Sequence, residues 1–239
     1  MKAIPSESNK ERVETKMKLT RIEIKSAIVG MVIGDGCLSK HKRTDTNNAY
    51  FQMSHCDAQY EYLMWKKGIL ENVSGCKVWP ATHKAPNGKI FKGWHLNSKA
   101  NPVYTKLYNR FYVYKKKSLD EYLVKMITSL ALAIMYMDDG CIGKAMPQYW
   151  TKETFYLCLD NFDYANLFLL KKSLKLKFDL DWNINKTSVK YYQLRLLNKH
   201  NQKFADIVRP YIELVPSMLY KLGSYASTSE EDVDIVRPV

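Results

Sequence analysis

The apolar positions of the first hundred residues fall into segments whose spacing predicts helices and strands. A nearly continuous apolar run at 21–34 predicts a buried helix, with Thr20 and Glu23 placed as a capping box at its start. Gly34 and Gly36 end this helix. The pattern then predicts two strand segments within 37–54, a helix opening at Asp57, strands at 76–81 and 89–97 around a turn at 86–88, and a helix near 102–114.

The second hundred residues repeat this order of elements. The segment IGDGCL at 33–38 returns as MDDGCI at 137–142, which sets Asp35 and Asp139 104 residues apart. Lys117 and Lys221 keep the same spacing. Solenoid repeats are roughly 20–50 residues long, so this period indicates a duplicated half-domain. The expected elements of the second copy are a helix at 130–139, strands near 141–159, a helix at 163–177, strands at 181–185 and 188–197, and a helix at 200–212.

The predicted fold class is therefore α+β, with the order αββαββα present twice and related by a pseudo-twofold axis. We expect the first half to span 19–122 and the second half 123–223. Residues 1–18 and the acidic segment 224–239 are polar and charged, so we expect loosely held tails at both ends.

The net charge narrows the choice of partner. Lys and Arg number 37 against 24 Asp and Glu, giving +13. Such an excess points to a polyanion, and nucleic acid is the usual one. A solvated basic surface and an anionic membrane surface are the alternatives. No stretch approaches about 18 uninterrupted apolar residues, and the N-terminus lacks the apolar core of a secretory signal.

The five cysteines do not form a metal-binding or disulfide pattern. Their number is odd, no CxxC pair occurs, and the five histidines form no HExxH-like pair. A disulfide framework or a zinc site is not expected. Free thiols favour an intracellular reducing compartment, with an organelle, a bacterium and a phage-infected cell all compatible.

Asp35 and Asp139 are the candidate catalytic and metal-binding residues. Each sits at the C-terminal end of an apolar helix, where the helix dipole disfavours a carboxylate by about 0.3–1 kcal/mol. If the two helices pack side by side in parallel, the acids meet and repel unless they are protonated or bridged by a metal. A hard divalent ion, Mg²⁺ above all, fits oxygen ligands of this kind, to which the carbonyls of Gly34 and Asp138 add further oxygens. Taken singly, each motif also fits an ordinary helix-ending turn.

The two repeated segments resemble the nine-residue motif of the LAGLIDADG homing endonucleases. The copies are IVGMVIGDG at 28–36 and LAIMYMDDG at 132–140. The segment 210–222, PYIELVPSMLYKL, is similar to the closing signature of the single-chain branch. The resemblance covers about residues 20–223. The first copy departs from the family pattern at Gly34, and the second carries Ile134 where the family often has Gly.

The resemblance implies a saddle-shaped monomer with a central two-helix interface and two antiparallel sheets along the DNA major groove. It implies that Asp35 and Asp139 bind Mg²⁺ near the scissile phosphates and that a basic residue supports each half. That residue maps to Lys221 in the second half. In the first half it maps to the run 115–117, where the repeat spacing favours Lys117 over Lys116. Cleavage by each half would yield a double-strand break.

Strand residues supply the candidate DNA contacts. In 191–196, alternation puts Tyr191, Gln193 and Arg195 on one face, and Arg and Gln can read guanine and adenine bidentately. Either base reading or phosphate contact fits each candidate, as does a plain solvated charge. The full set of candidates is Lys40, Lys42, Arg43, Lys92, His95, Lys144, Lys152, Lys190, Gln193 and Arg195.

Three functions remain open at this point. The first is a site-specific endonuclease, borne by an intron or free-standing, that makes a Mg²⁺-dependent double-strand break in a long, largely asymmetric DNA target. The second is a maturase that assists intron RNA splicing. The third is a DNA-binding protein on the same scaffold that does not cut. Retention of both acids and both lysines favours the first, and the target sequence does not follow from the protein sequence.

Overall fold

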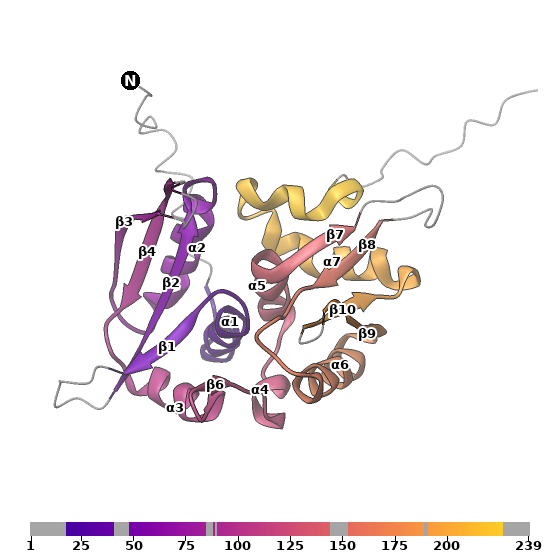
Figure 1. Cartoon of the computed structure of the whole chain (residues 1–239), viewed down its shortest axis with the longest axis horizontal. Helices are drawn as coiled ribbons and strands as arrows, with labels where there is room; N and C mark the ends of the chain where they lie inside the picture. Colours follow the sequence, from indigo (N-terminus) through magenta and orange to yellow (C-terminus); the bar gives the residue numbers. More distant parts are fainter. Residues whose placement is uncertain are drawn as a thin grey trace, which may run out of the picture.

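The computed structural model describes residues 18–40, 48–84, 88, 90–143, 153–188 and 191–226 of the 239. Two antiparallel sheets flank a central pair of helices, as Figure 1 shows. Each sheet has four strands in the order first, second, fourth, third. This arrangement confirms the α+β class and its duplication, and the saddle fold that the family resemblance implied.

The first half begins with the capping box that the sequence predicted. The Thr20 hydroxyl accepts a hydrogen bond from the Glu23 amide at 3.2 Å, and the Glu23 carboxylate accepts one from the Thr20 amide at 2.8 Å. Alternation in β2 buries every second residue, and those residues face the helices. The elements of this half are α1 (Arg21–Ile33), β1 (Cys37–Lys40), β2 (Ala49–Cys56), η3 (Asp57–Gln59), α2 (Tyr60–Leu70), β3 (Cys76–Lys84), β4 (Ile90–Ser98) and α3 (Pro102–Phe111).

The second half repeats this layout. Its sheet order is β7-β8-β10-β9, with Leu194 and Leu196 of β10 buried and Gln193 and Arg195 turned to the other face. The elements are α5 (Ser129–Asp139), β7 (Gly140–Gly143), β8 (Thr154–Leu157), α6 (Tyr164–Phe178), β9 (Trp182–Lys186), β10 (Tyr192–Leu196), η4 (Asn198–His200) and α7 (Asn201–Ile212).

The two motif helices, α1 and α5, form the centre of the molecule. At one end the Ser26 and Thr128 hydroxyls are hydrogen-bonded at 2.8 Å. At the other end the Asp35 amide donates to the Asp138 carboxylate at 3.3 Å. The helices therefore run side by side in the same direction. A glycine is required where they cross, because a Cβ on Gly30 would lie 2.7 Å from the carbonyl oxygen of Ala131.

The connections differ from the sequence prediction. The helix expected at 102–114 ends at Phe111, and the chain turns into a two-stranded hairpin of β5 (Tyr112–Val113) and β6 (Lys116–Lys117). Tyr114 and Lys115 take left-handed φ values of 48° and 65°, as a tight two-residue hairpin turn demands. Two further segments were not predicted: α4 (Glu121–Lys125), and η5 (Pro216–Tyr225), which reaches into the expected C-terminal tail.

Within the described ranges, no helix combines the length and the apolar character needed to cross a bilayer. The five cysteines are free thiols.

Candidate active site between the paired helix ends

The two motif acids lie where α1 and α5 end. Asp35 follows the last turn of α1, and Asp139 is the last residue of α5. Burial, followed by the nearby carboxylates of Asp35 and Asp138, raises the pKa of Asp139 to about 7. Burial and then Asp138 likewise raise the pKa of Asp35. The acids therefore share one crowded, partly desolvated environment that disfavours their charge, which is a frequent property of functional sites.

One lysine from each half points at the same place in its repeat. The Lys117 ammonium donates to the carbonyls of Gly36 at 2.9 Å and Gly34 at 3.0 Å. The Lys221 ammonium donates to the carbonyl of Gly140 at 2.5 Å, and Gly140 is the repeat equivalent of Gly36. Burial lowers the pKa of both lysines, and the acids partly oppose that effect. Lys116, the other first-half candidate, is exposed on the hairpin.

Asp138 contributes its side chain to the site, a role the sequence did not suggest. Its carboxylate forms an ion pair with Lys66, and both side chains are fully buried. Lys66 also lies 3.1 Å from His55 Nε2, while His55 Nδ1 is 3.9 Å from the Asp35 carboxylate. Burial and the Lys66 charge lower the pKa of His55 to about 4, so the imidazole is neutral at pH 7. The Gly34 carbonyl, a candidate metal oxygen, accepts a hydrogen bond from Lys117.

Two signals in the sequence point to Lys66 and Asp138, the site residues whose side chains the sequence analysis did not include. Lys66 occupies a core position of α2, in the helical pattern of Tyr62, Leu63, Ile69 and Leu70, all of which are buried. A lysine is rarely buried without a partner. Asp138 is the position where the second motif carries an acid and the first carries glycine. Neither signal names the partner, since the two residues lie 72 positions apart.

The donor set fits a divalent cation. The carboxylates of Asp35 and Asp138 and a ring nitrogen of His55 lie within 4.8 Å of one another. The two Asp138 oxygens already accept hydrogen bonds from Lys66 and from the Asp35 amide, so Asp35 is the acid of this cluster that would bind a cation. Asp139 adds a carboxylate whose pKa is raised by burial and then by the nearby charge of Asp35. Clustered acid oxygens of this kind suit a hard divalent ion, which would relieve their repulsion.

The candidate DNA contacts divide between the two faces of the sheets. His95 lies on the outer face of the first sheet, opposite Ser54 and Trp79. Gln193 and Arg195 lie on the outer face of the second.

Lys40 and Lys92 occupy the alternate strand positions, on the side of the sheets that faces the helices, and both residues are exposed. Lys40 accordingly donates to Asn109 of α3 at 3.2 Å. The remaining candidates, Lys42, Arg43, Lys144, Lys152 and Lys190, lie outside the described residues.

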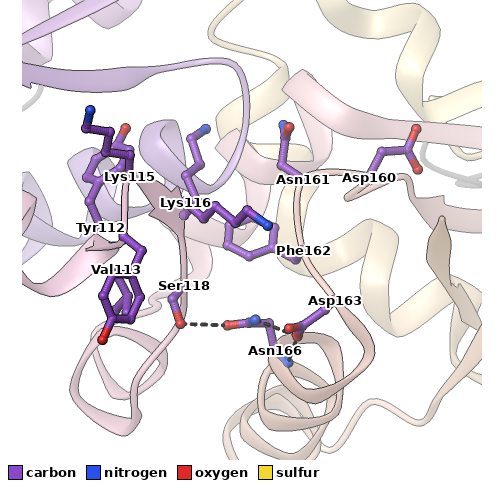
Figure 2. Close-up of a pocket in the computed structure, with 12 residues that line it drawn as sticks. Tyr112, Val113, Lys115, Lys116, Ser118, Asp160, Asn161, Phe162, Asp163 and Asn166 are labelled. Atoms are coloured by element: carbon purple, nitrogen blue, oxygen red, sulfur yellow. Dashed lines mark hydrogen bonds between the residues drawn. The ribbon is translucent and has the colours of Figure 1, made fainter. Parts of the chain in front are cut away.

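A cleft of about 730 Å³ opens beside Lys117, between the β5–β6 hairpin and the loop that precedes α6. Figure 2 shows Lys115 and Lys116 on the hairpin side, with Asp160 and Asn161 across from them. At its floor Ser118 donates to the Asn166 side chain at 3.3 Å. The cleft therefore lies between the two halves and is lined by Lys117.

The duplicated fold and the acids at its central helix ends define a class of protein. The chain matches the LAGLIDADG DNA endonuclease family over residues 25–204, and it belongs to that family. This confirms the family that the repeated motifs suggested.

Curated relatives carry different names. The chain is 28% identical over 234 residues to cytochrome b mRNA maturase bI2 of Saccharomyces cerevisiae, covering 91% of this chain and 51% of the relative. It is 30% identical over 202 residues to the protein RecA of Mycolicibacterium chitae, covering 82% of this chain and 45% of the relative. The chain thus spans about half the length of these relatives.

Solved structures share the fold. The homing endonuclease I-WcaI bound to its DNA recognition sequence superposes with a TM-score of 0.72 at 23% identity, covering 92% of this chain and 94% of that one. Full-length DUF199/WhiA from Thermatoga maritima gives a TM-score of 0.52 at 14% identity, covering 88% and 63%. At these identities the likeness describes the fold.

Proposed function

We propose that this chain is a site-specific endonuclease that makes a Mg²⁺-dependent double-strand break in a long, largely asymmetric DNA target, and that it acts as a monomer. The observation that carries the proposal is the equivalent placement of one lysine in each half, at the helix end that carries the motif acid. Asp35 and Lys117 serve one half, and Asp139 and Lys221 serve the other, with each lysine bonded to an equivalent glycine carbonyl. Two like sets in one chain suit the two strands of a duplex.

The side chains divide the work of phosphodiester hydrolysis. Asp35 and Asp139 would hold a Mg²⁺ ion through their carboxylates. The ion would supply the Lewis-acid chemistry that polarises the phosphoryl oxygen and lowers the pKa of water. Lys117 and Lys221, fixed by their carbonyl contacts, stabilise the negative charge that builds on the phosphate. Substrate binding rests on the net charge of +13 and on outer-face residues such as Arg195.

The test is incubation with a library of long DNA duplexes in Mg²⁺, followed by sequencing of the ends. The DNA that flanks the gene's own insertion point is the first target to include. We expect one dominant cut site, loss of cutting in EDTA, and loss of the double-strand break in Asp35→Asn and Asp139→Asn. Asp206→Asn is the matched control, because Asp206 is a half-exposed acid of α7 that pairs with Arg209. Full cutting by both motif variants would refute the proposal.

A second candidate, an RNA maturase, is favoured by the similarity to maturase bI2 along 91% of the chain. This function would use the same basic surface on intron RNA. The test is splicing of the host intron transcript with and without the protein. Stimulated splicing by a protein that never nicks DNA would place this function first, and both activities in one chain would support both proposals.

A further inference from the structure

The Lys66–Asp138 ion pair ties α2 of the first half to α5 of the second half. Both side chains are fully buried, so removing one partner alone leaves an uncompensated buried charge. The pair has further contacts on the α2 side. The Lys66 ammonium lies 4.0 Å from the centroid of the Tyr62 ring, and the Tyr62 hydroxyl donates to the Ile134 carbonyl of α5 at 3.3 Å. The pair therefore belongs to a packed polar cluster at the interface.

The pair breaks the internal repeat. The helices α2 and α6 begin at equivalent tyrosines, Tyr60 and Tyr164, and on that spacing Lys66 corresponds to Leu170. Leu170 is fully buried. Asp138 corresponds to Gly34 of the first motif. Leu170 and Gly34 thus stand at the positions equivalent to Lys66 and Asp138. Because the same fold forms at these positions without an ion pair, the fold itself does not require one.

The Asp138 carboxylate is seated against the backbone that carries Asp35. One of its oxygens accepts from the Asp35 amide at 3.3 Å. A Cβ on Gly34 would lie 2.5 Å from the same oxygen, so the glycine is what allows this approach. Asp139 is held differently, because it is still part of α5, whereas Asp35 follows the end of α1. Asp35, which lies beyond the end of its helix, is therefore the acid whose backbone is held by a residue of the other half.

We propose that Lys66 and Asp138 are positioning residues that orient Asp35 and thereby make the two half-sites unequal. Loss of the pair slows the half-site of Asp35 more than that of Asp139. This inference rests on the proposed nuclease function. Its distinguishing consequence is a difference between the two DNA strands, which a purely structural role would not produce.

The test removes both charges together. Lys66→Met with Asp138→Leu replaces the pair by apolar residues of similar size, and Lys66→Met with Asp138→Asn keeps an oxygen acceptor for the Asp35 amide. The matched control is Lys67→Met with Glu71→Leu, which removes the neighbouring, more exposed i,i+4 pair of the same helix. Circular dichroism melting establishes that each variant is folded. If the leucine variant does not fold, the asparagine variant carries the same comparison.

The readout is strand-resolved cleavage of a supercoiled plasmid that carries the recovered target, with Asp35→Asn used to assign the strand that depends on Asp35. We expect that strand to be cut about 10–100-fold more slowly in the leucine variant, with nicked circles accumulating. The asparagine variant recovers part of the rate, and the control behaves as wild type. Equal slowing of both strands, or no slowing in the folded variants, would overturn the inference.

A wild-type protein that cuts no DNA would refute the nuclease proposal without deciding this one. The positioning role is then measured by calorimetric titration with Mn²⁺ alone. We expect the leucine variant to bind Mn²⁺ about tenfold more weakly than the control variant, because the Asp35 carboxylate loses its orientation. Identical Mn²⁺ affinities in the two variants would reject the role of the pair.

Discussion

The helix crossing at Gly30 gives the sharpest stability prediction, because the chain contains a matched control. Gly30 and Gly68 are both helical glycines, in α1 and α2. A Cβ on Gly30 would lie 2.7 Å from the Ala131 carbonyl oxygen and 2.9 Å from its Cα. A Cβ on Gly68 meets nothing within 4 Å. The same substitution by alanine is therefore blocked by backbone at one position and open at the other.

The magnitude follows from these two environments. Alanine in place of a helical glycine stabilises by roughly 0.5–1 kcal/mol, which we expect in full for Gly68→Ala. Gly30→Ala makes the same gain but forces the helices apart by roughly 0.7 Å to reach ordinary contact with Ala131. Overpacking of this kind costs about 1–3 kcal/mol. Because the helical gain is common to both, the two variants should differ by about 1–3 kcal/mol, with Gly30→Ala the less stable.

The assay is urea unfolding of both variants beside the wild type. The difference should appear as a midpoint shift of roughly 0.3–1 M with an unchanged slope. Gly30→Ala should also cut DNA more slowly, because the helix crossing sets the distance between the acids. Equal midpoints for the two alanine variants would refute the close packing of α1 against α5.

Three further predictions follow from the site. In EDTA at pH 8, the free energy of unfolding of Asp139→Asn should exceed that of the wild type by about 2–4 kcal/mol, and below pH 4 the two should be equal. Between about pH 4 and pH 7 the Asp139 carboxyl keeps its proton in the folded protein and loses it in the unfolded chain, so the wild type becomes less stable as pH rises through this range. A stability difference between the two proteins that does not change with pH would contradict this prediction. Lys66→Met alone should lower the free energy of unfolding, measured in urea, by about 3–5 kcal/mol, because Asp138 stays buried without its partner. A decrease below about 1 kcal/mol would refute the buried ion pair. Mg²⁺ at about 100 times its Kd should raise the melting temperature by roughly 5–10 °C, an effect that should vanish when Asp35 and Asp139 are both changed to Asn.

The sequence by itself determined the class of the fold. The apolar run at 21–34, its capping box and its return near 130–139 predicted two buried helices, and α1 and α5 lie there. The repeat also predicted that the ends of both helices carry acids. These features are local, since helix periodicity and caps depend on neighbouring residues, and a duplication doubles the signal for each. The family resemblance pointed to Lys221 and the run 115–117, where the spacing of 104 favoured Lys117, and Lys117 and Lys221 make equivalent contacts in the structure.

Only the tertiary structure decided the features that differ between the two repeats or that depend on long-range contacts. The β5–β6 hairpin depends on two non-glycine residues with left-handed φ values, which local propensity disfavours. Which face of a sheet carries Lys40 depends on register and on the helix packed against it. The partner of Asp138 is Lys66, 72 residues away, and a buried charge finds its counter-ion in space and not along the chain. Local patterns therefore located the acids, while long-range packing decided how each one is held.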